Sequence, residues 1–369
     1  MSQTTTIASD LSVTLPEASQ LISSTWRQPG GHRMVIALLG EPGLGKSAIG
    51  HQVAADIAPT LGVSPDRVIF ANLSHWDTTD MGGIPDLSGD VARWKPPALF
   101  HALRAGTGPA ILILDEAAGD LTLPMQNLLC RLVYDRCAGE LALTDTLYIL
   151  LNGNRTSDKS GANRLSTKLG NRMLQMTVRF SQTAWEAWAH AHGIGADILA
   201  FHRWKADTAP DNLGLTNPED KAPSTAFGFD PSRSINPTPR AWAEMVNRID
   251  RSLPPSLYLK ALAGAVTLGP ATEFVAFQQY FKELPPIHVI WQQPDAVPVP
   301  TSLQGQYALA IYAASHVDRD TFPALLTLGQ RLHKDLSIPL VLAAQQRCPA
   351  ATQTAAFGQW AIAHQHLIF

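Results

Sequence analysis

The chain has 369 residues and a formal net charge of −3, with 45% hydrophobic and 16% charged residues. This composition excludes a largely disordered chain, and the small net charge gives no overall bias towards nucleic acid. No apolar run approaches the roughly 20 residues of a membrane span and the N-terminal segment MSQTTTIASD lacks the features of a signal peptide, so a cytoplasmic protein without a membrane partner is expected.

Short apolar runs alternate with helix-like segments over the first 180 residues. Runs that are apolar throughout and separated by helices indicate parallel strands, because both faces of such a sheet are covered. The sequence therefore predicts an α/β domain with a central parallel sheet. Its expected strands are residues 34–39, 67–73, 110–115, 146–152 and 173–180.

The strand pattern stops near residue 181, and helical patterns take over. The segment 205–238 is rich in Pro, Asp and Asn and indicates a long irregular connection. The prolines of 284–301 indicate a linker. These breaks predict three domains, at residues 1–180, 181–285 and 286–369. The helices expected after the irregular connection are 239–251, 256–268, 270–283, 303–315, 321–332 and 336–346.

The first expected strand leads directly into GEPGLGKS, residues 40–47, and a helical pattern follows. This fits the pattern G-x-x-x-x-G-K-[ST], in which backbone N–H groups face a phosphate chain at the positive end of a helix. Lys46 is expected to reach the β- and γ-phosphates and Ser47 to bind Mg²⁺. The alternative is an ordinary glycine-rich turn. The predicted ATP-binding residues of this loop are Gly40, Glu41, Pro42, Gly43, Leu44, Gly45, Lys46, Ser47 and Ala48.

A second motif, ILILDEA, ends the third expected strand at residues 111–117. An apolar strand that ends in Asp-Glu is typical of a Walker B motif. Asp115 is then expected to hold Mg²⁺ through water, and Glu116 to orient or deprotonate the attacking water. The alternative is an acidic strand end that faces solvent. No N-K-x-D motif occurs, so ATP is expected rather than a guanine nucleotide.

The tripeptide Gly-Asn-Arg follows the fourth expected strand and occurs again before the fifth. Together with the two motifs above, it resembles the AAA+ ATPases, and the segment LSTKLGNRM resembles LPEAQLDRF of the MoxR-like group. The resemblance implies that Asn154 is sensor 1, which holds the attacking water, and that Arg172 reaches the γ-phosphate bound by the neighbouring subunit. Asn171 stands where the family has aspartate. The alternative is that Arg155 and Arg172 are solvated loop charges.

Two further segments carry the resemblance, which covers residues 15–285. NPTPRAWAEM, residues 236–245, is similar to the lid segment with sensor 2, which implies that Arg240 folds over the phosphates; a simple helix-start arginine is the alternative. Residues 77–103 resemble a hairpin insert with a helix restart. Its candidate partner contacts are Met81, Ile84 and Trp94, although Trp94 is alternatively buried under the hairpin.

The resemblance implies an AAA+ domain with the strand order of that family and the P-loop strand in the middle, an α-helical lid and a small helical C-terminal domain. It also implies a homo-oligomeric ring, with a hexamer expected, that uses ATP and Mg²⁺ to remodel or activate a partner protein. The tail resembles that of phage and bacterial relatives encoded beside a protein with a von Willebrand A domain, a plausible partner. The alternative is an ATP-switched nucleic-acid binder, such as an initiator or helicase loader, which the few basic residues of the tail do not favour.

Overall fold

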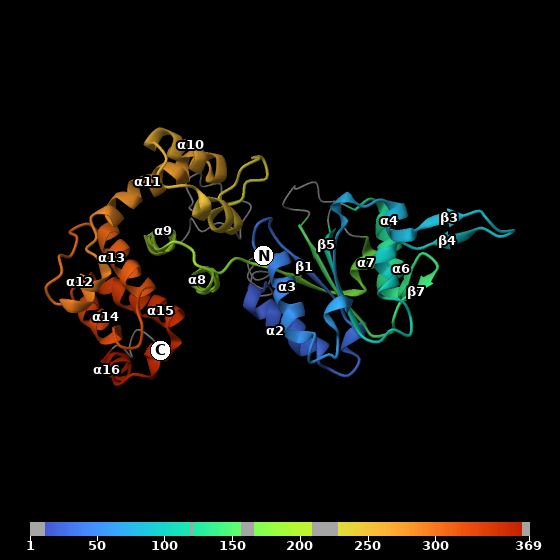
Figure 1. Ribbon diagram of the computed structural model, residues 1–369, viewed down its shortest axis with the longest axis horizontal. Helices are drawn as coiled ribbons and strands as arrows, with labels where there is room; N and C mark the ends of the chain where they lie inside the picture. Colours follow the sequence, from blue (N-terminus) through green and yellow to red (C-terminus); the bar gives the residue numbers. More distant parts are fainter. Residues whose placement is uncertain (1–11, 119–120, 156–165, 209–227, 364–369) are drawn as a thin grey trace, which may run out of the picture. The chain divides into compact units, whose positions relative to one another are not determined.

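The computed structural model describes residues 12–118, 121–155, 166–208 and 228–363. The chain forms two compact units, residues 1–180 and 181–369. The first unit is built around a parallel sheet, and the second is helical over its described residues (Figure 1). Among the described residues, no helix has both the length and the apolar character that crossing a membrane requires.

The sheet of the first unit has five strands in the order β2-β5-β8-β1-β9, and all neighbouring pairs run parallel. The five predicted strands are confirmed, with ends that shift by a few residues. The prediction that the strand before the phosphate loop lies in the middle of the sheet is wrong, because β1 lies between β8 and the edge strand β9. The strands are β1 (Val35–Leu39), β2 (Val68–Asn72), β5 (Ala110–Ala118), β8 (Leu147–Gly153) and β9 (Met173–Thr177).

Helices cover both faces of this sheet, as Figure 1 shows. On one face, alternate residues of β1, β5 and β8 join a core with α6 (Leu123–Asp135). On the other face, α3 (Lys46–Ile57) packs against β5 and β8. Gly50 is the point of close approach, because a Cβ there would lie 3.4 Å from side-chain atoms of Ile113, Leu150 and Asn152.

Helix α2 (Leu15–Trp26) packs against α3 and precedes the sheet in the chain. A capping box starts it: Thr14 N donates to Glu17 Oε2 at 2.7 Å, and Glu17 N donates to Thr14 Oγ1 at 3.4 Å. Its buried residues, Ala18, Ile22 and Trp26, recur every fourth position and form the apolar stripe of a surface helix.

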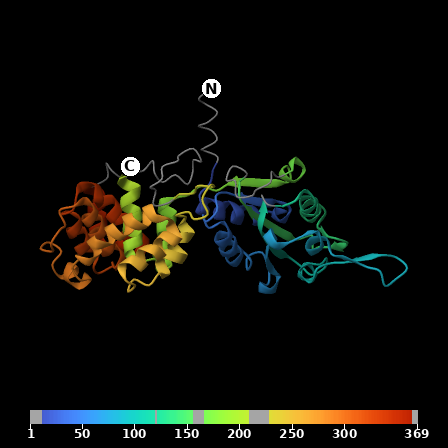
Figure 2. The same ribbon diagram turned by 90° about the horizontal axis from the view of Figure 1, so that it is seen from above.

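The hairpin expected within residues 77–103 is present. Helix α4 (Thr78–Gly82) leads into the antiparallel strands β3 (Ile84–Asp86) and β4 (Arg93–Lys95), and α5 (Ala98–His101) follows. The hairpin extends away from the rest of the first unit (Figure 2). At its base, Gly83 has φ 88°, and a Cβ there would lie 2.3 Å from the carbonyl oxygen of Lys95, so only glycine fits.

The partner contacts predicted for this insert are partly wrong. Met81 is only 1% exposed and belongs to the core under α6, so it cannot contact a partner. Trp94 is 46% exposed, which excludes the alternative that it is buried under the hairpin. The exposed apolar side chains of the hairpin are Ile84, Leu87, Val91 and Trp94.

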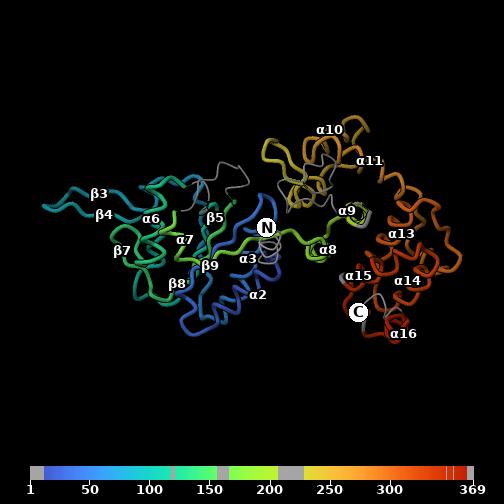
Figure 3. Tube along the Cα trace, turned by 180° about the vertical axis from the view of Figure 1, so that it is seen from behind, coloured from blue at the N-terminus to red at the C-terminus, as the bar shows by residue number. Residues whose placement is uncertain are grey.

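In the second unit, α13 packs against α9, α11 and α15 (Figure 3). The helices predicted near 256–268, 270–283, 303–315, 321–332 and 336–346 are all present. The helices are α8 (Gln182–Ala191), α9 (Ala196–Thr208), α10 (Pro255–Val266), α11 (Leu268–Lys282), α12 (Ile287–Gln292), α13 (Leu303–Ser315), α14 (Phe322–Gly329), α15 (Ser337–Arg347) and α16 (Ala355–Ala363).

The stretch 284–301, interpreted above as a linker, is packed instead of extended. It contains α12, which begins after Pro286, and its residues Ile290 and Val297 are buried. Arg331 Nη1 donates to the carbonyl oxygens of Pro294 and Val297. Proline is tolerated at a helix start, and Pro286 is the N-cap of α12. The boundary between a lid and a C-terminal module at residue 285 stays a prediction.

Candidate nucleotide and hydrolysis site

The predicted catalytic residues of the first unit, Arg172 excepted, gather at one edge of the sheet. The strands are parallel, so the loop after β1, the Asp115-Glu116 pair of β5 and Asn154 after β8 all lie at the carboxyl edge. In open α/β sheets, ligands bind at this edge.

The loop after β1 has the backbone of a phosphate loop. Gly43 and Gly45 have φ angles of 79° and 104°, in the left-handed region that favours glycine. Gly40 passes so close to β9 that a Cβ there would lie 2.9 Å from the carbonyl oxygen of Val178. Gly45 is the N-cap of α3, so the first N–H groups of that helix open onto the loop.

The side chain of Lys46 folds back onto the loop and bonds to its backbone. Its Nζ donates to the carbonyl oxygens of Gly40 at 2.7 Å and Glu41 at 2.8 Å, and to Asn154 Oδ1 at 3.3 Å. Asn154 Nδ2 in turn donates to Glu116 Oε2 at 3.1 Å. One side chain thus links the loop lysine to the Walker B glutamate, so three residues far apart in the sequence form one chain of hydrogen bonds.

The two predicted magnesium ligands are in direct contact. Ser47 Oγ donates to Asp115 Oδ2 at 2.6 Å. A hydroxyl and a carboxylate are oxygen ligands of the kind that Mg²⁺ binds, and they fit this ion. Glu116, the next residue, has φ 53°, and the pairing of β5 with β8 shifts register between Leu114 and Ala118. A non-glycine residue in this conformation is strained, and such strain is concentrated at functional sites.

Sequence reasoning missed two parts of this site. Arg155 Nη2 lies 2.8 Å from Glu41 Oε1, and Glu41 is only 3% exposed, so Arg155 ties the segment after β8 to the phosphate loop. It is therefore not a solvated loop charge. Asn152 is fully buried on the α3 face of β8. The Arg155–Glu41 pair could have been expected from the acidic residue inside GEPGLGKS. The buried Asn152 could have been expected from the polar residue that ends an otherwise apolar strand.

Arg172 lies at the opposite edge of the sheet. It precedes β9, whose first residue, Met173, pairs with Val35 at the start of β1. The phosphate loop begins six positions further on, roughly 20 Å away at 3.3 Å per residue, so Arg172 cannot reach it in its own chain. Its guanidinium lies 4.5 Å from the ring centroid of Tyr134 and donates to the carbonyl oxygen of Lys168. These contacts hold Arg172 in place without Asn171.

Arg240 belongs to the second unit, and its side chain is exposed. It is the N-cap of a π-helical turn, η6 (Ala241–Met245), which continues as a 3₁₀ turn, η7 (Val246–Arg248), where a regular helix was expected. π-helical turns are rare and frequently occur at functional sites. That Arg240 folds over the phosphates stays a prediction.

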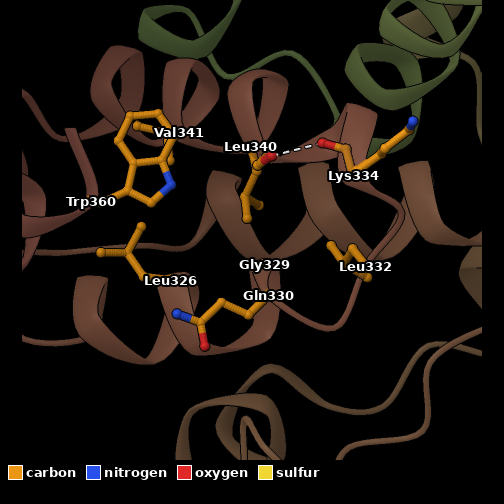
Figure 4. A pocket seen from close by; sticks show the side chains of 9 residues that line it. Leu326, Gly329, Gln330, Leu332, Lys334, Leu340, Val341 and Trp360 are labelled. Atoms are coloured by element: carbon orange, nitrogen blue, oxygen red, sulfur yellow. Dashed lines mark hydrogen bonds between the residues drawn. The ribbon is translucent and has the colours of Figure 1, made fainter. Parts of the chain in front are cut away.

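Each unit contains a cavity lined by described residues. One, of about 240 Å³, adjoins the Ser47–Asp115 pair and is lined by Ser47, His51, Phe70, Ala71, Asn72, Ile113, Asp115 and Asn152. The other, of about 320 Å³, lies in the second unit, and its lining combines apolar side chains with those of Gln330, Lys334 and Ser337 (Figure 4). This second lining has no carboxylate and no phosphate loop, so it lacks the chemistry of the nucleotide site.

Comparison with known proteins adds little detail. No protein-family model matches the chain, and no curated protein matches it. Among solved structures, C. elegans PCH-2 is similar at 14% identity with a TM-score of 0.32, over 71% of this chain and 66% of that one. The Aeropyrum pernix ORC1 protein, solved in complex with DNA, is similar at 13% identity with a TM-score of 0.37, over 85% and 77%. Both TM-scores lie below 0.5, so neither structure assigns a role to any residue of this chain.

The strand order, the loop after β1 and the Asp-Glu pair at the end of β5 define the fold of the first unit. It is an α/β fold with a phosphate loop at the carboxyl edge of a parallel sheet, followed in the chain by a helical unit.

Proposed function

We propose that this protein is an AAA+ ATPase that binds ATP with Mg²⁺ and hydrolyses it. The observation that carries the proposal is the hydrogen-bonded chain from Lys46 through Asn154 to Glu116, beside the Ser47–Asp115 contact. A phosphate-binding lysine, a water-directed carboxylate and two magnesium ligands meet at one sheet edge. This is the set of groups that phosphoryl transfer to water requires.

Each residue has a distinct role in this proposal. Lys46 and the N–H groups at the start of α3 bind the phosphates, and Ser47 and Asp115 hold the metal. The Glu116 carboxylate accepts a proton from the attacking water, and Asn154 fixes the position of that carboxylate and of the water. Mg²⁺ supplies neutralisation of charge on the β- and γ-phosphate oxygens.

Nucleotide binding tests the phosphate loop directly. Lys46→Ala is expected to weaken ATP binding roughly 10- to 100-fold, because a hydrogen bond to a charged group contributes about 1.5–3 kcal/mol. Titration with a fluorescent ATP analogue measures the change, and phosphate release confirms the loss of turnover. Lys95→Ala is the matched control, since Lys95 pairs with Asp86 on the hairpin, outside the site. Equal affinity in the Lys46→Ala and parental proteins would contradict the assignment of the loop.

We propose that the working form is a homo-oligomeric ring, with a hexamer expected. Arg172 lies too far from the phosphate loop of its own chain and is held in place by Tyr134 and the Lys168 carbonyl. Both observations support an arginine that acts on the γ-phosphate bound by a neighbouring subunit. Arg240, in the helical unit, is proposed to contact the phosphates as sensor 2.

We further propose that hydrolysis remodels or activates a partner protein. The hairpin β3–β4 supports this, because exposed apolar side chains gathered on one projecting element are typical of protein contacts. A partner with a von Willebrand A domain is proposed from the sequence resemblance alone. Within the part of the chain that the structure describes, no observation favours a nucleic-acid substrate, which remains the alternative outcome of the test.

Partner binding tests this role. Leu87→Ser/Val91→Ser is expected to reduce capture of a purified von Willebrand A-domain partner by the Glu116→Gln protein at saturating ATP, because it removes two exposed anchors at 75% and 71% exposure. In an otherwise parental chain, basal ATP hydrolysis should stay unchanged. Leu257→Ser, on the exposed side of α10, is the control. Equal capture by the hairpin variant argues against the hairpin as the contact. Salt-sensitive binding of DNA by the parental protein favours the alternative.

A further inference from the structure

Asn152 is one of the residues that line the cavity beside the Ser47–Asp115 pair. Asn152 lies in β8 and is fully buried, and neither its Nδ2 nor its Oδ1 has a hydrogen-bond partner among the described residues. Buried amides nearly always find partners, because an unsatisfied one destabilises the fold. A leucine of similar size would pack at this position without that cost, so packing alone does not explain the asparagine.

The position of Asn152 connects it to the metal site. It lies on the sheet face covered by α3, where its Nδ2 would be 3.4 Å from a Cβ on Gly50. Ser47 is one helical turn before Gly50 on the same helix, and its hydroxyl donates to Asp115. Asn152, Ser47 and Asp115 line one cavity, so the Asn152 side chain borders the space that adjoins both proposed magnesium ligands.

The cavity suits water better than an apolar group. Its volume of about 240 Å³ has room for several water molecules, and hydroxyl, carboxylate and amide groups line it. Mg²⁺ dehydrates reluctantly and usually keeps several waters when proteins bind it. An asparagine amide offers two donors and an acceptor, so it can hold a water from either side.

We propose that Asn152 is a positioning residue of the magnesium site. From the lining of the cavity, its amide hydrogen-bonds water of the cation's hydration shell and thereby orients that shell against Ser47 and Asp115. The inference rests on the proposed ATPase function and assigns to Asn152 a part in it that no sequence motif indicates.

Asn152→Leu keeps the size of the side chain and removes its polar atoms. Groups that orient metal ligands typically change metal affinity about 10- to 100-fold, so the MgCl₂ concentration for half-maximal binding of a fluorescent ATP analogue should rise about tenfold or more. Binding without magnesium should not change. The unfolding temperature of the nucleotide-free protein should not fall, because the variant loses an unsatisfied buried amide.

Two further variants sharpen the test. Ile113→Val alters the same cavity without removing a polar group and should keep the parental magnesium midpoint. Asn152→Ser retains a small polar group and is expected to show a smaller rise in the midpoint than Asn152→Leu. If Asn152→Leu does not fold, the serine variant carries the test by the same criteria.

Failure of this inference can be told apart from failure of the proposed function. Asp115→Asn should raise the MgCl₂ concentration for half-maximal binding whether or not Asn152 has the proposed role. If Asp115→Asn raises it and Asn152→Leu does not, the role of Asn152 is overturned and the metal site stands. If neither variant changes it, the metal site is wrong, and the proposed function falls with it. A lower unfolding temperature in Asn152→Leu with an unchanged midpoint makes the amide a packing element and overturns the inference.

Discussion

Glu116→Gln protein is expected to bind ATP about as tightly as the parental protein and to hydrolyse it about 10²- to 10⁴-fold more slowly, the usual contribution of a general base. The substitution keeps the shape of the side chain and an oxygen that can accept the bond from Asn154 Nδ2. It removes only the negative charge that can take a proton from water. Lys46, Ser47 and Asp115 are untouched, so the phosphates and the metal keep their ligands.

Two measurements separate binding from chemistry in this variant. Titration with a fluorescent ATP analogue gives the affinity, and phosphate release under single-turnover conditions gives the hydrolysis rate. Glu140→Gln is the matched control, because Glu140 accepts a hydrogen bond from the backbone of Trp94 at the hairpin base and has no part in the site. Parental turnover by Glu116→Gln would show that another group activates the water and that Asp115-Glu116 is not a Walker B pair.

Arg172→Ala and Glu116→Gln proteins, each almost inactive alone, are expected to regain ATP hydrolysis when mixed. An arginine that reaches a neighbour's γ-phosphate contributes roughly 10³- to 10⁵-fold in rate. A ring of mixed subunits contains interfaces that pair the intact Glu116 of one variant with the intact Arg172 of the other. With random mixing, about a quarter of the interfaces of a cyclic ring have this pairing, so the recovered rate should stand far above either variant alone.

The mixing experiment needs a control for the loss of a surface arginine and proof of exchange. Arg131→Ala removes an exposed arginine of α6, which approaches Asp135, and should hydrolyse ATP at the parental rate. Fluorescence energy transfer between labelled subunits confirms that the variants share rings. A mixture no more active than its components, with exchange confirmed, would remove Arg172 from the active site.

The sequence predicted the strands well because their signal is local. Two patterns can be recognised from neighbouring residues alone, without knowledge of the rest of the fold. They are the apolar runs between helical patterns and the glycines at fixed spacing before a lysine. What sequence reasoning missed depends on which strands become neighbours. β8 lies between β5 and β1, and this order brings Arg155, just after β8, against Glu41 in the loop after β1.

The wrong predictions have equally physical causes. Met81 stands in a short polar segment, so its sequence surroundings favoured exposure, but α4 packs against α6 and buries it. The prolines of 284–301 were interpreted as spacer residues, whereas Pro286 is the N-cap of α12. A proline sets a backbone angle and removes a donor, and both effects suit a helix start as well as an extended segment.

At Glu116, the left-handed backbone lowers the stability of the folded chain, while the side chain is the proposed catalytic base. A side chain with a Cβ in this region costs the folded chain roughly 1–3 kcal/mol, and glycine would adopt the same angles without strain. Laboratory evolution that scored only thermal stability would therefore replace Glu116 with glycine and discard the proposed base. A screen that scored only turnover would keep the glutamate and its strain, so the same library would diverge at this position according to what was selected.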